Sequence, residues 1–139
     1  MLLRTDEVRS AVARAMKHHR RHTASIGGAD VDAVVAAVAQ SEGIKISVRD
    51  AHLPLGYYGR WLRSADGSEV FEVSTGLASR DWTIAHELGH LMLRHYVDSD
   101  ERGCRVDDPF AEYQAERFAA LLTSRLAVAR RAPRDAVFS

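Results

Sequence analysis

The sequence has a single cysteine, Cys104, and only three prolines among its 139 residues. One cysteine excludes an intrachain disulfide and a zinc cage built from several thiolates. Cys104 lies in a charged stretch, where it is an incidental exposed thiol, a redox-sensing thiol or an inhibitory zinc ligand. The sequence also lacks the ~20-residue apolar run of a membrane span and any secretory signal pattern at its start. We therefore expect a cytoplasmic protein that does not enter a membrane.

The charge shows no excess of either sign, because 19 basic residues balance 19 acidic ones. A formal net charge of zero gives no overall attraction to nucleic acid or to a membrane surface. Basic residues do gather at 17–22 and in the tail from Arg130, and the first group suits a helix C-terminus better than a phosphate- or DNA-binding arm. No recognition-helix motif accompanies these groups, so we expect no strong direct nucleic-acid binding.

The order of the periodic segments predicts an α+β fold. Apolar stripes with helical spacing indicate helices at residues 5–20, 31–40, about 80–96 and from 109 to about 125. Shorter alternating segments indicate strands at residues 44–48, 57–62 and 69–73. The Asp66-Gly67 pair is a typical hairpin turn between the last two strands. Strands followed by helices predict a small, mostly antiparallel three-stranded sheet packed against a helical layer.

The most informative stretch is His86-Glu87-Leu88-Gly89-His90, which lies in an apolar, helix-forming segment. Residues four apart share one face of a helix, so both histidines can present a ring nitrogen to one metal ion. Glu87 lies one position round the helix, where a general base is needed beside a catalytic metal. Ser79 is the predicted N-cap, and Gly89 implies that another element packs closely there. The alternative is a structural helix with two surface histidines.

A catalytic zinc site needs a third protein ligand and an open position. Glu112 is our candidate, because it lies on the next predicted helix after His90, with enough chain between them to turn back. Glu116 follows four residues later on the same face, where it would orient a ligand histidine. Two alternatives stay open: Glu116 is the ligand in place of Glu112, or both are solvated surface acids.

Two linked motifs resemble the ImmA/IrrE family of small zinc metallopeptidases. That family carries an arginine and an aromatic-Thr pair before Ala-His-Glu-Leu-Gly-His, followed by a Glu-x-x-Ala-Asn/Asp-x-Phe-Ala signature. The corresponding stretches here are Arg80-Asp81-Trp82-Thr83-Ile84-Ala85-His86-Glu87-Leu88-Gly89-His90 and Glu112-Tyr113-Gln114-Ala115-Glu116-Arg117-Phe118-Ala119. The family's Asn or Asp is Glu116 in this sequence, one methylene longer, and the usual Leu-Leu-Met-Pro ending is Leu121-Leu122-Thr123-Ser124.

The resemblance implies a compact zincin-like fold with the His-Glu-x-x-His helix at its centre. It implies one Zn²⁺ held by His86, His90 and Glu112, a gluzincin-like set, with Glu87 as the catalytic acid and base. It further implies a metalloendopeptidase acting on a protein substrate, often a helix-turn-helix repressor, in transcription regulation. We divide the single-domain chain into a basic N-terminal helix and glycine-rich break (1–28), a zinc metallopeptidase domain (29–127) and a basic C-terminal tail (128–139).

Peptide hydrolysis also needs a donor for the transition-state oxyanion and a place for an extended substrate. The donor candidates, each more simply explained as packing or surface, are His95, Tyr96 and Tyr113. The candidate edge for adding a substrate strand is the segment Glu69, Val70, Phe71, Glu72 and Val73. The rival interpretation is a catalytically silent zinc-binding module that sequesters a regulatory partner without cleavage. Glu87 argues against it, because a pure binder has no use for a general base.

Overall fold

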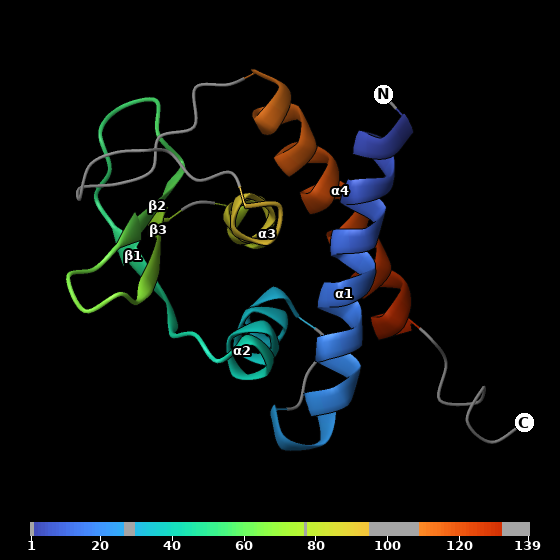
Figure 1. The fold of residues 1–139 in the computed structure, drawn as a ribbon. Helices are drawn as coiled ribbons and strands as arrows, with labels where there is room; N and C mark the ends of the chain where they lie inside the picture. Colours follow the sequence, from blue (N-terminus) through green and yellow to red (C-terminus); the bar gives the residue numbers. More distant parts are fainter. Residues whose placement is uncertain (1, 27–29, 77, 95–108, 132–139) are drawn as a thin grey trace, which may run out of the picture.

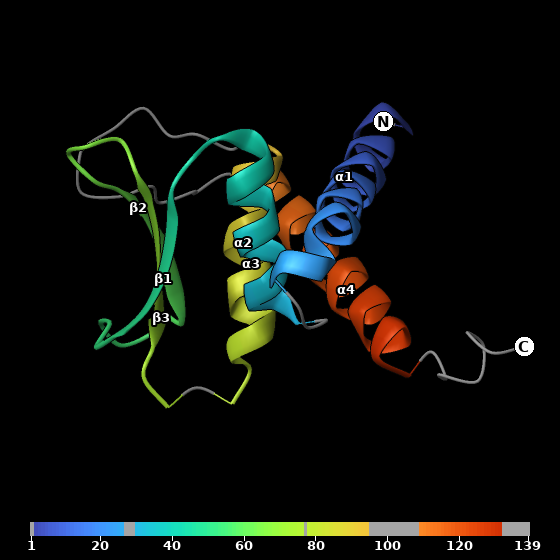
Figure 2. The ribbon, with the colours of Figure 1, turned by 90° about the horizontal axis from the view of Figure 1, so that it is seen from below.

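A computed structural model describes residues 2–26, 30–76, 78–94 and 109–131. The described elements follow the order α1 (Leu2–Ile26), α2 (Val31–Glu42), β1 (Ile46–Ala51), β2 (Gly59–Arg63), β3 (Glu69–Ser74), α3 (Arg80–Met92) and α4 (Pro109–Arg131). Figures 1 and 2 show the sheet on one side, α2 and α3 beside it, and α1 and α4 beyond them. The predicted α+β architecture is confirmed, with α3 between the sheet and α4.

Local signals account for most of the helix boundaries. The Asp30 side chain accepts a hydrogen bond from the Ala33 amide at 2.8 Å, and Gly43 ends α2 with a left-handed φ of 68°, both as predicted. α1 runs past the predicted end at residue 20, because no glycine or proline interrupts the chain before Gly27. Ser79 is the N-cap residue of α3, as predicted. Ser79 makes no side-chain cap bond, and its backbone carbonyl accepts from the Thr83 amide instead.

The sheet has the strand order β1-β3-β2 and is mixed. β2 and β3 form the predicted antiparallel hairpin, whereas β1 pairs with β3 in parallel, so the sheet is not mostly antiparallel. The prediction that residues 69–73 form an edge for a substrate strand is wrong for the same reason. β3 is the central strand, and its backbone groups are already paired with a neighbour on each side.

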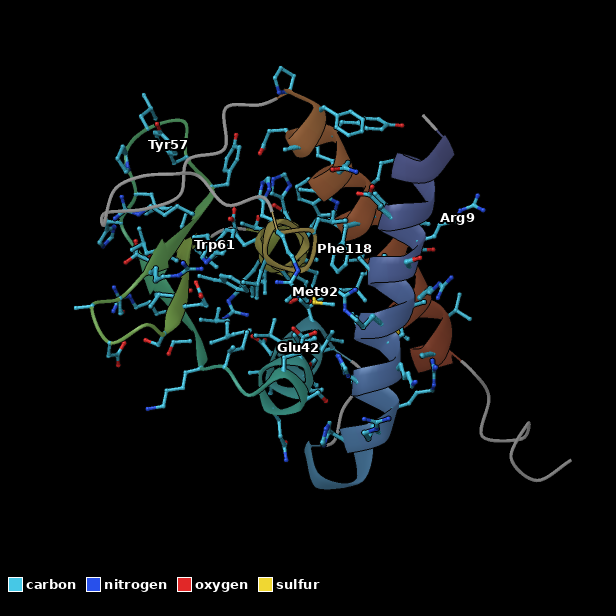
Figure 3. All side chains as sticks on the ribbon, viewed as in Figure 1. Arg9, Glu42, Tyr57, Trp61, Met92 and Phe118 are labelled. Carbon is cyan, nitrogen blue, oxygen red and sulfur yellow. The ribbon has the colours of Figure 1, made fainter. Side chains whose placement is uncertain are left out.

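The core fills the space between the sheet and the helices. Trp61 on β2 and Phe71 on β3 are opposite each other in the register and almost fully buried. Figure 3 shows Trp61 between the sheet and α3, and Phe118 of α4 between α3 and α1. A β-carbon added at Gly89 would lie 3.0 Å from the Phe118 side chain. The predicted close packing at Gly89 is therefore confirmed, and it offsets the low helix propensity of glycine.

α1 is tied to the end of α3 by a long-range hydrogen bond. Arg14 of α1 donates to the backbone carbonyl of Met92 at 2.9 Å, and its guanidinium lies 3.5 Å from the Glu42 carboxylate at the end of α2. The last carbonyls of a helix have no partner within the helix, so a cation there satisfies one of them and complements the helix dipole. α1 is thus part of the support of α3.

Glu72 of β3 holds the outer strands together through two arginines. Its carboxylate accepts from Arg60 of β2 at 2.6 Å and from Arg49 of β1 at 2.9 and 3.1 Å, although the side chain is only 8% exposed. Burial alone would raise the pKa of Glu72. The hydrogen bonds and charges of Arg60 and Arg49 outweigh burial, so the pKa is lowered from its ordinary value.

We expect Glu72→Gln to lower the free energy of unfolding by about 1–2 kcal/mol at neutral pH, a value that allows for the partly exposed arginines. A lowered folded-state pKa means that this contribution is complete above the unfolded pKa of ~4.3 and is lost as the pH falls through the folded value. Denaturant titrations at pH 7, 5 and 3 should show the gap between wild type and variant closing at pH 3, whereas the exposed Glu7→Gln control should show no gap. A gap that does not change with pH would contradict this account.

Candidate metal centre

α3 places both histidines of the His-Glu-x-x-His motif on its α4-facing side. The rings of His86 and His90 lie edge to face, with centroids 4.9 Å apart. The His90 side chain is 4% exposed and that of His86 13% exposed. Ile84 and Leu88 face the core at 0% exposure, so their burial fixes the rotation of α3 about its axis. The same periodicity that forms the helix therefore presents the two histidines together.

Glu112 of α4 completes a cluster of three ligand-type side chains. Its Oε1 lies 3.2 Å from Nε2 of His86, and its Oε2 lies 2.8 Å from Nε2 of His90. The ligand atoms of the three residues lie within 4.8 Å of one another. The structure thus brings together the three residues that the sequence nominated as ligands, and the packing of Phe118 at Gly89 sets the distance between their two helices.

The donor set fits a divalent metal such as zinc. Tetrahedral zinc with bonds of about 2.0–2.1 Å separates neighbouring ligand atoms by about 3.3 Å. The separations of 2.8 and 3.2 Å are those of hydrogen bonds between carboxylate and imidazole nitrogens, and a small outward shift of Glu112 reaches the zinc spacing. Two histidines and one carboxylate also leave the fourth position open, as catalytic zinc sites require.

Glu87 projects on the other side of the histidines, toward β2. Its side chain is buried, and a β-carbon added at Gly59 would lie 3.4 Å from its Oε2. Burial, together with the charge of the nearby Glu112 carboxylate, raises the pKa of Glu87 to about 8. A carboxyl group with this pKa accepts and releases a proton near neutral pH, as a general acid and base must.

These side chains line one cleft of about 500 Å³. The residues around it are Gly56, Tyr57, Tyr58, Gly59, Arg60, Ser79, Trp82, Thr83, His86, Glu87, His90, Glu112 and Glu116. Residues 56–60, at the start of β2, form one wall, and α3 and α4 supply the other. The arrangement can hold a metal between two helices and place a buried carboxyl group beside it, with room for a peptide-sized ligand.

A family comparison agrees with this chemistry. The model of the peptidase M78 family, described as the IrrE N-terminal-like domain, matches residues 39–135. The chain belongs to this family. A comparison with curated proteins found no match. Among the helices described, none is long and apolar enough to cross a membrane.

The IrrE N-terminal-like family supports a metallopeptidase-type function for the chain, and the cluster of His86, His90 and Glu112 gives that function a site for a metal. The family match includes the sheet, α3 and α4, whereas α1 and most of α2 precede it. α1 nonetheless belongs to the same packed body, through Arg14 and through the core contacts of Val12 and Ala15.

The cleft does not include all of the site residues that were predicted from the sequence. Glu116 lines it but is exposed, and Nδ1 of His86 is buried with no hydrogen-bond partner among the described residues. Glu116 therefore does not orient His86, because its side chain stays at the rim. Tyr113 is 57% exposed and is absent from the lining, so the structure does not bring it to the ligands. His95, Tyr96 and Cys104 lie outside the described residues.

Tyr57, Tyr58 and Trp82 line the cleft and were not predicted as site residues. The spacing could have predicted Trp82 as a site residue, because Trp82, His86 and His90 follow one another at four-residue intervals on one face of α3. For Tyr57 and Tyr58, the only sequence signal was that two aromatic residues lie between Gly56 and Gly59. Their place in the site depends on where β2 lies relative to α3, which no local pattern states.

Gly59 allows β2 to approach α3 at the Glu87 carboxyl group. A β-carbon at this position would lie 2.6 Å from Cγ2 of Thr83, which is closer than real contacts allow, and 3.3 Å from the backbone oxygen of Glu72. Thr83 is itself buried at 5% exposure. Any larger residue must push the strand away from the helix or turn Thr83 out of place.

We expect Gly59→Ala to lower peptidase activity by about 10- to 100-fold, because small displacements of a reacting group reduce rates steeply, and to destabilise the fold by about 1–3 kcal/mol. The double variant Gly59→Ala/Thr83→Ser lacks the clashing methyl group and should recover most of both losses. Thr83→Ser alone is the control. Rates and unfolding midpoints of the four proteins give the test, and a double variant no better than Gly59→Ala would disprove the clash.

Proposed function

We propose that the chain is a zinc-dependent metalloendopeptidase that hydrolyses a protein substrate. One observation carries this proposal: His86 and His90 of α3 meet Glu112 of α4 in the same cleft that contains the buried carboxyl group of Glu87. Zinc, when bound by these three ligands, lowers the pKa of a water molecule and polarises a peptide carbonyl. The remaining steps belong to the protein itself.

Glu87 is the proton carrier in this scheme. Its carboxylate accepts the proton of the attacking water at an Oε atom and later delivers it to the nitrogen of the leaving amine. Burial favours both transfers, because a desolvated carboxyl group has a pKa close to the working pH. The wall formed by residues 56–60 excludes bulk water from one side of Glu87 and borders the path of the substrate.

The substrate we propose is a helix-turn-helix transcriptional repressor. The support is the resemblance of the two motifs to the ImmA/IrrE family, whose members often act on such repressors. The competing function is a zinc-binding module that holds the repressor without cutting it. The geometry favours the peptidase, because a binder gains nothing from burying an acidic side chain beside the metal ligands.

The test is to incubate the zinc-loaded protein with candidate helix-turn-helix repressors from the same genome and to follow the products by mass spectrometry. Matched samples contain Glu87→Gln, or wild type treated with a chelator. Cleavage by the zinc-loaded wild type alone supports the peptidase and its substrate. A stable complex with no cleavage supports the binding module. Cleavage of an unfolded protein such as casein, with the repressor intact, supports the peptidase but rejects the repressor as its substrate.

A further inference from the structure

All but one of the large apolar side chains that are exposed in the described residues either line the cleft or adjoin, in sequence, a residue that lines it. They are Leu55 at 103%, Tyr58 at 65%, Trp82 at 38%, Tyr113 at 57% and Val128 at 58%. Tyr58 and Trp82 line the cleft, Leu55 precedes its lining residue Gly56, and Tyr113 follows Glu112. Val128 lies four to five turns farther along α4 and is the exception. Exposed apolar side chains that cluster in one place mark binding surfaces more often than scattered ones do.

Trp82 stands directly beside a proposed ligand. Its ring lies 5.2 Å from that of His86, tilted by 45°, in the first turn of α3. One part of the indole therefore packs on the imidazole, while more than a third of the residue stays exposed in the cleft. A group that stacks on the free part of this indole lies next to the metal ligands.

Tyr58 supplies an aromatic side chain on the opposite wall. Its backbone carbonyl accepts from the Ser74 amide at 2.8 Å, which joins it to the end of β3. The segment 55–58 is therefore hydrogen-bonded to the sheet at its last residue. An aromatic residue next to the first residue of β2 and another in the first turn of α3 make a preorganised site, which loses little conformational entropy on binding.

Two of the charged residues that line the cleft, Arg60 and Glu112, already have partners. Arg60 is paired with Glu72, and Glu112 accepts from both histidines. Glu116 also lines the cleft and is exposed, whereas Tyr58 and Trp82 give its two walls an apolar surface. Such a wall recognises an apolar side chain better than a polar one, because a polar side chain would lose water without gaining a hydrogen bond.

We propose that Trp82 and Tyr58 form a specificity subsite for a large apolar side chain, of the Leu, Met or Phe class, in an extended peptide segment next to the bond that is cut. The proposal rests on the peptidase function and names the substrate class of that same site.

The experiment uses the full-length, zinc-loaded protein carrying Glu87→Gln, so that binding is measured without cleavage. Dye-labelled peptides that differ at one position, Phe against Asn, are titrated by fluorescence anisotropy. We expect the Phe peptide to bind about 10- to 100-fold more tightly. Adding Trp82→Ala or Tyr58→Ala should reduce this preference to less than threefold, while Trp82→Phe should retain most of it. Val128→Ala, the exposed apolar control outside the cleft, should leave it unchanged.

Several outcomes would overturn the subsite. The first is an undiminished Phe preference in both alanine variants. The second is a loss of zinc affinity in Trp82→Ala, which would show that Trp82 supports His86. The third is dimerisation through Trp82, measured by size-exclusion chromatography. With Glu87 intact, Trp82→Ala should raise KM for the Phe peptide by about tenfold with kcat little changed. If the wild type cleaves nothing while the Phe preference depends on Trp82, the peptidase function fails, and Trp82 and Tyr58 form an apolar peptide-binding site with no role in cleavage. If cleavage occurs without any Phe preference, the peptidase function stands and the apolar subsite fails.

Discussion

Glu87→Gln is expected to lower kcat for peptide hydrolysis by about 10³-fold or more, since a positioned general base contributes roughly 10²- to 10⁴-fold. Glutamine keeps the size and most of the shape of glutamate, so the packing against Gly59 is preserved. Its amide cannot accept the proton of the attacking water. Glu87 also stands apart from the three ligand atoms, whose cluster is formed by His86, His90 and Glu112. Zinc affinity should therefore stay within about threefold of the wild type.

A second variant separates proton transfer from packing. Glu87→Asp keeps a carboxylate but withdraws it by one methylene from the position beside β2, so we expect an intermediate loss of about 10- to 100-fold. Steady-state kinetics on a fluorogenic peptide, with zinc content measured for each protein, give the comparison. A Glu87→Gln protein that keeps its zinc and cleaves within tenfold of the wild type would rule out Glu87 as the base.

Glu112→Ala is expected to weaken zinc binding by about 10³-fold or more, because it removes one of three protein ligands and the only anionic one. It also leaves Nε2 of both histidines without the oxygen atoms that now lie 2.8 and 3.2 Å away. In the wild type, free zinc at 100 times its Kd should stabilise the fold by about 2.7 kcal/mol, which raises Tm by roughly 8 °C in a domain of this size. The variant should show almost no shift at the same zinc concentration.

Glu116→Ala is the matched control for this experiment, because Glu116 lies one turn farther along the same helix at the rim of the same cleft. Its zinc affinity should change by less than about threefold, since its side chain is exposed and makes no bond to His86. Isothermal titration calorimetry on the two variants decides between the two glutamates. If Glu116→Ala loses zinc and Glu112→Ala retains it, the ligand assignment must be exchanged.

The part of the site that the sequence predicted lies on single helices. The positions of His86, Glu87 and His90 on one turn of α3 follow from helical geometry, which depends only on neighbours along the chain. The hairpin at Asp66-Gly67 and the caps of α2 could be predicted for the same reason. Ser79 is also the N-cap residue that was predicted for α3, although its side chain makes no cap bond.

The parts that could not be predicted depend on which elements become neighbours. β3 has the composition of a strand, but its central position follows from the parallel pairing of β1, two segments earlier in the chain. The wall with Tyr57 and Tyr58 belongs to the site only because Gly59 lets β2 approach Thr83. These are long-range contacts, and a local pattern carries no information about them.

The sequence by itself determined the chemical groups, their helical spacing and the family, because those depend on residue identity and on interactions within a few positions of the chain. The tertiary structure decided that Glu112 reaches both histidines, that Glu87 is buried beside β2, and that Trp82 and Tyr58 face the same cleft. The physical reason is packing. The contact of Phe118 at Gly89 and the close approach at Gly59 set the distances between α3, α4 and β2, and those distances make separate side chains into one site.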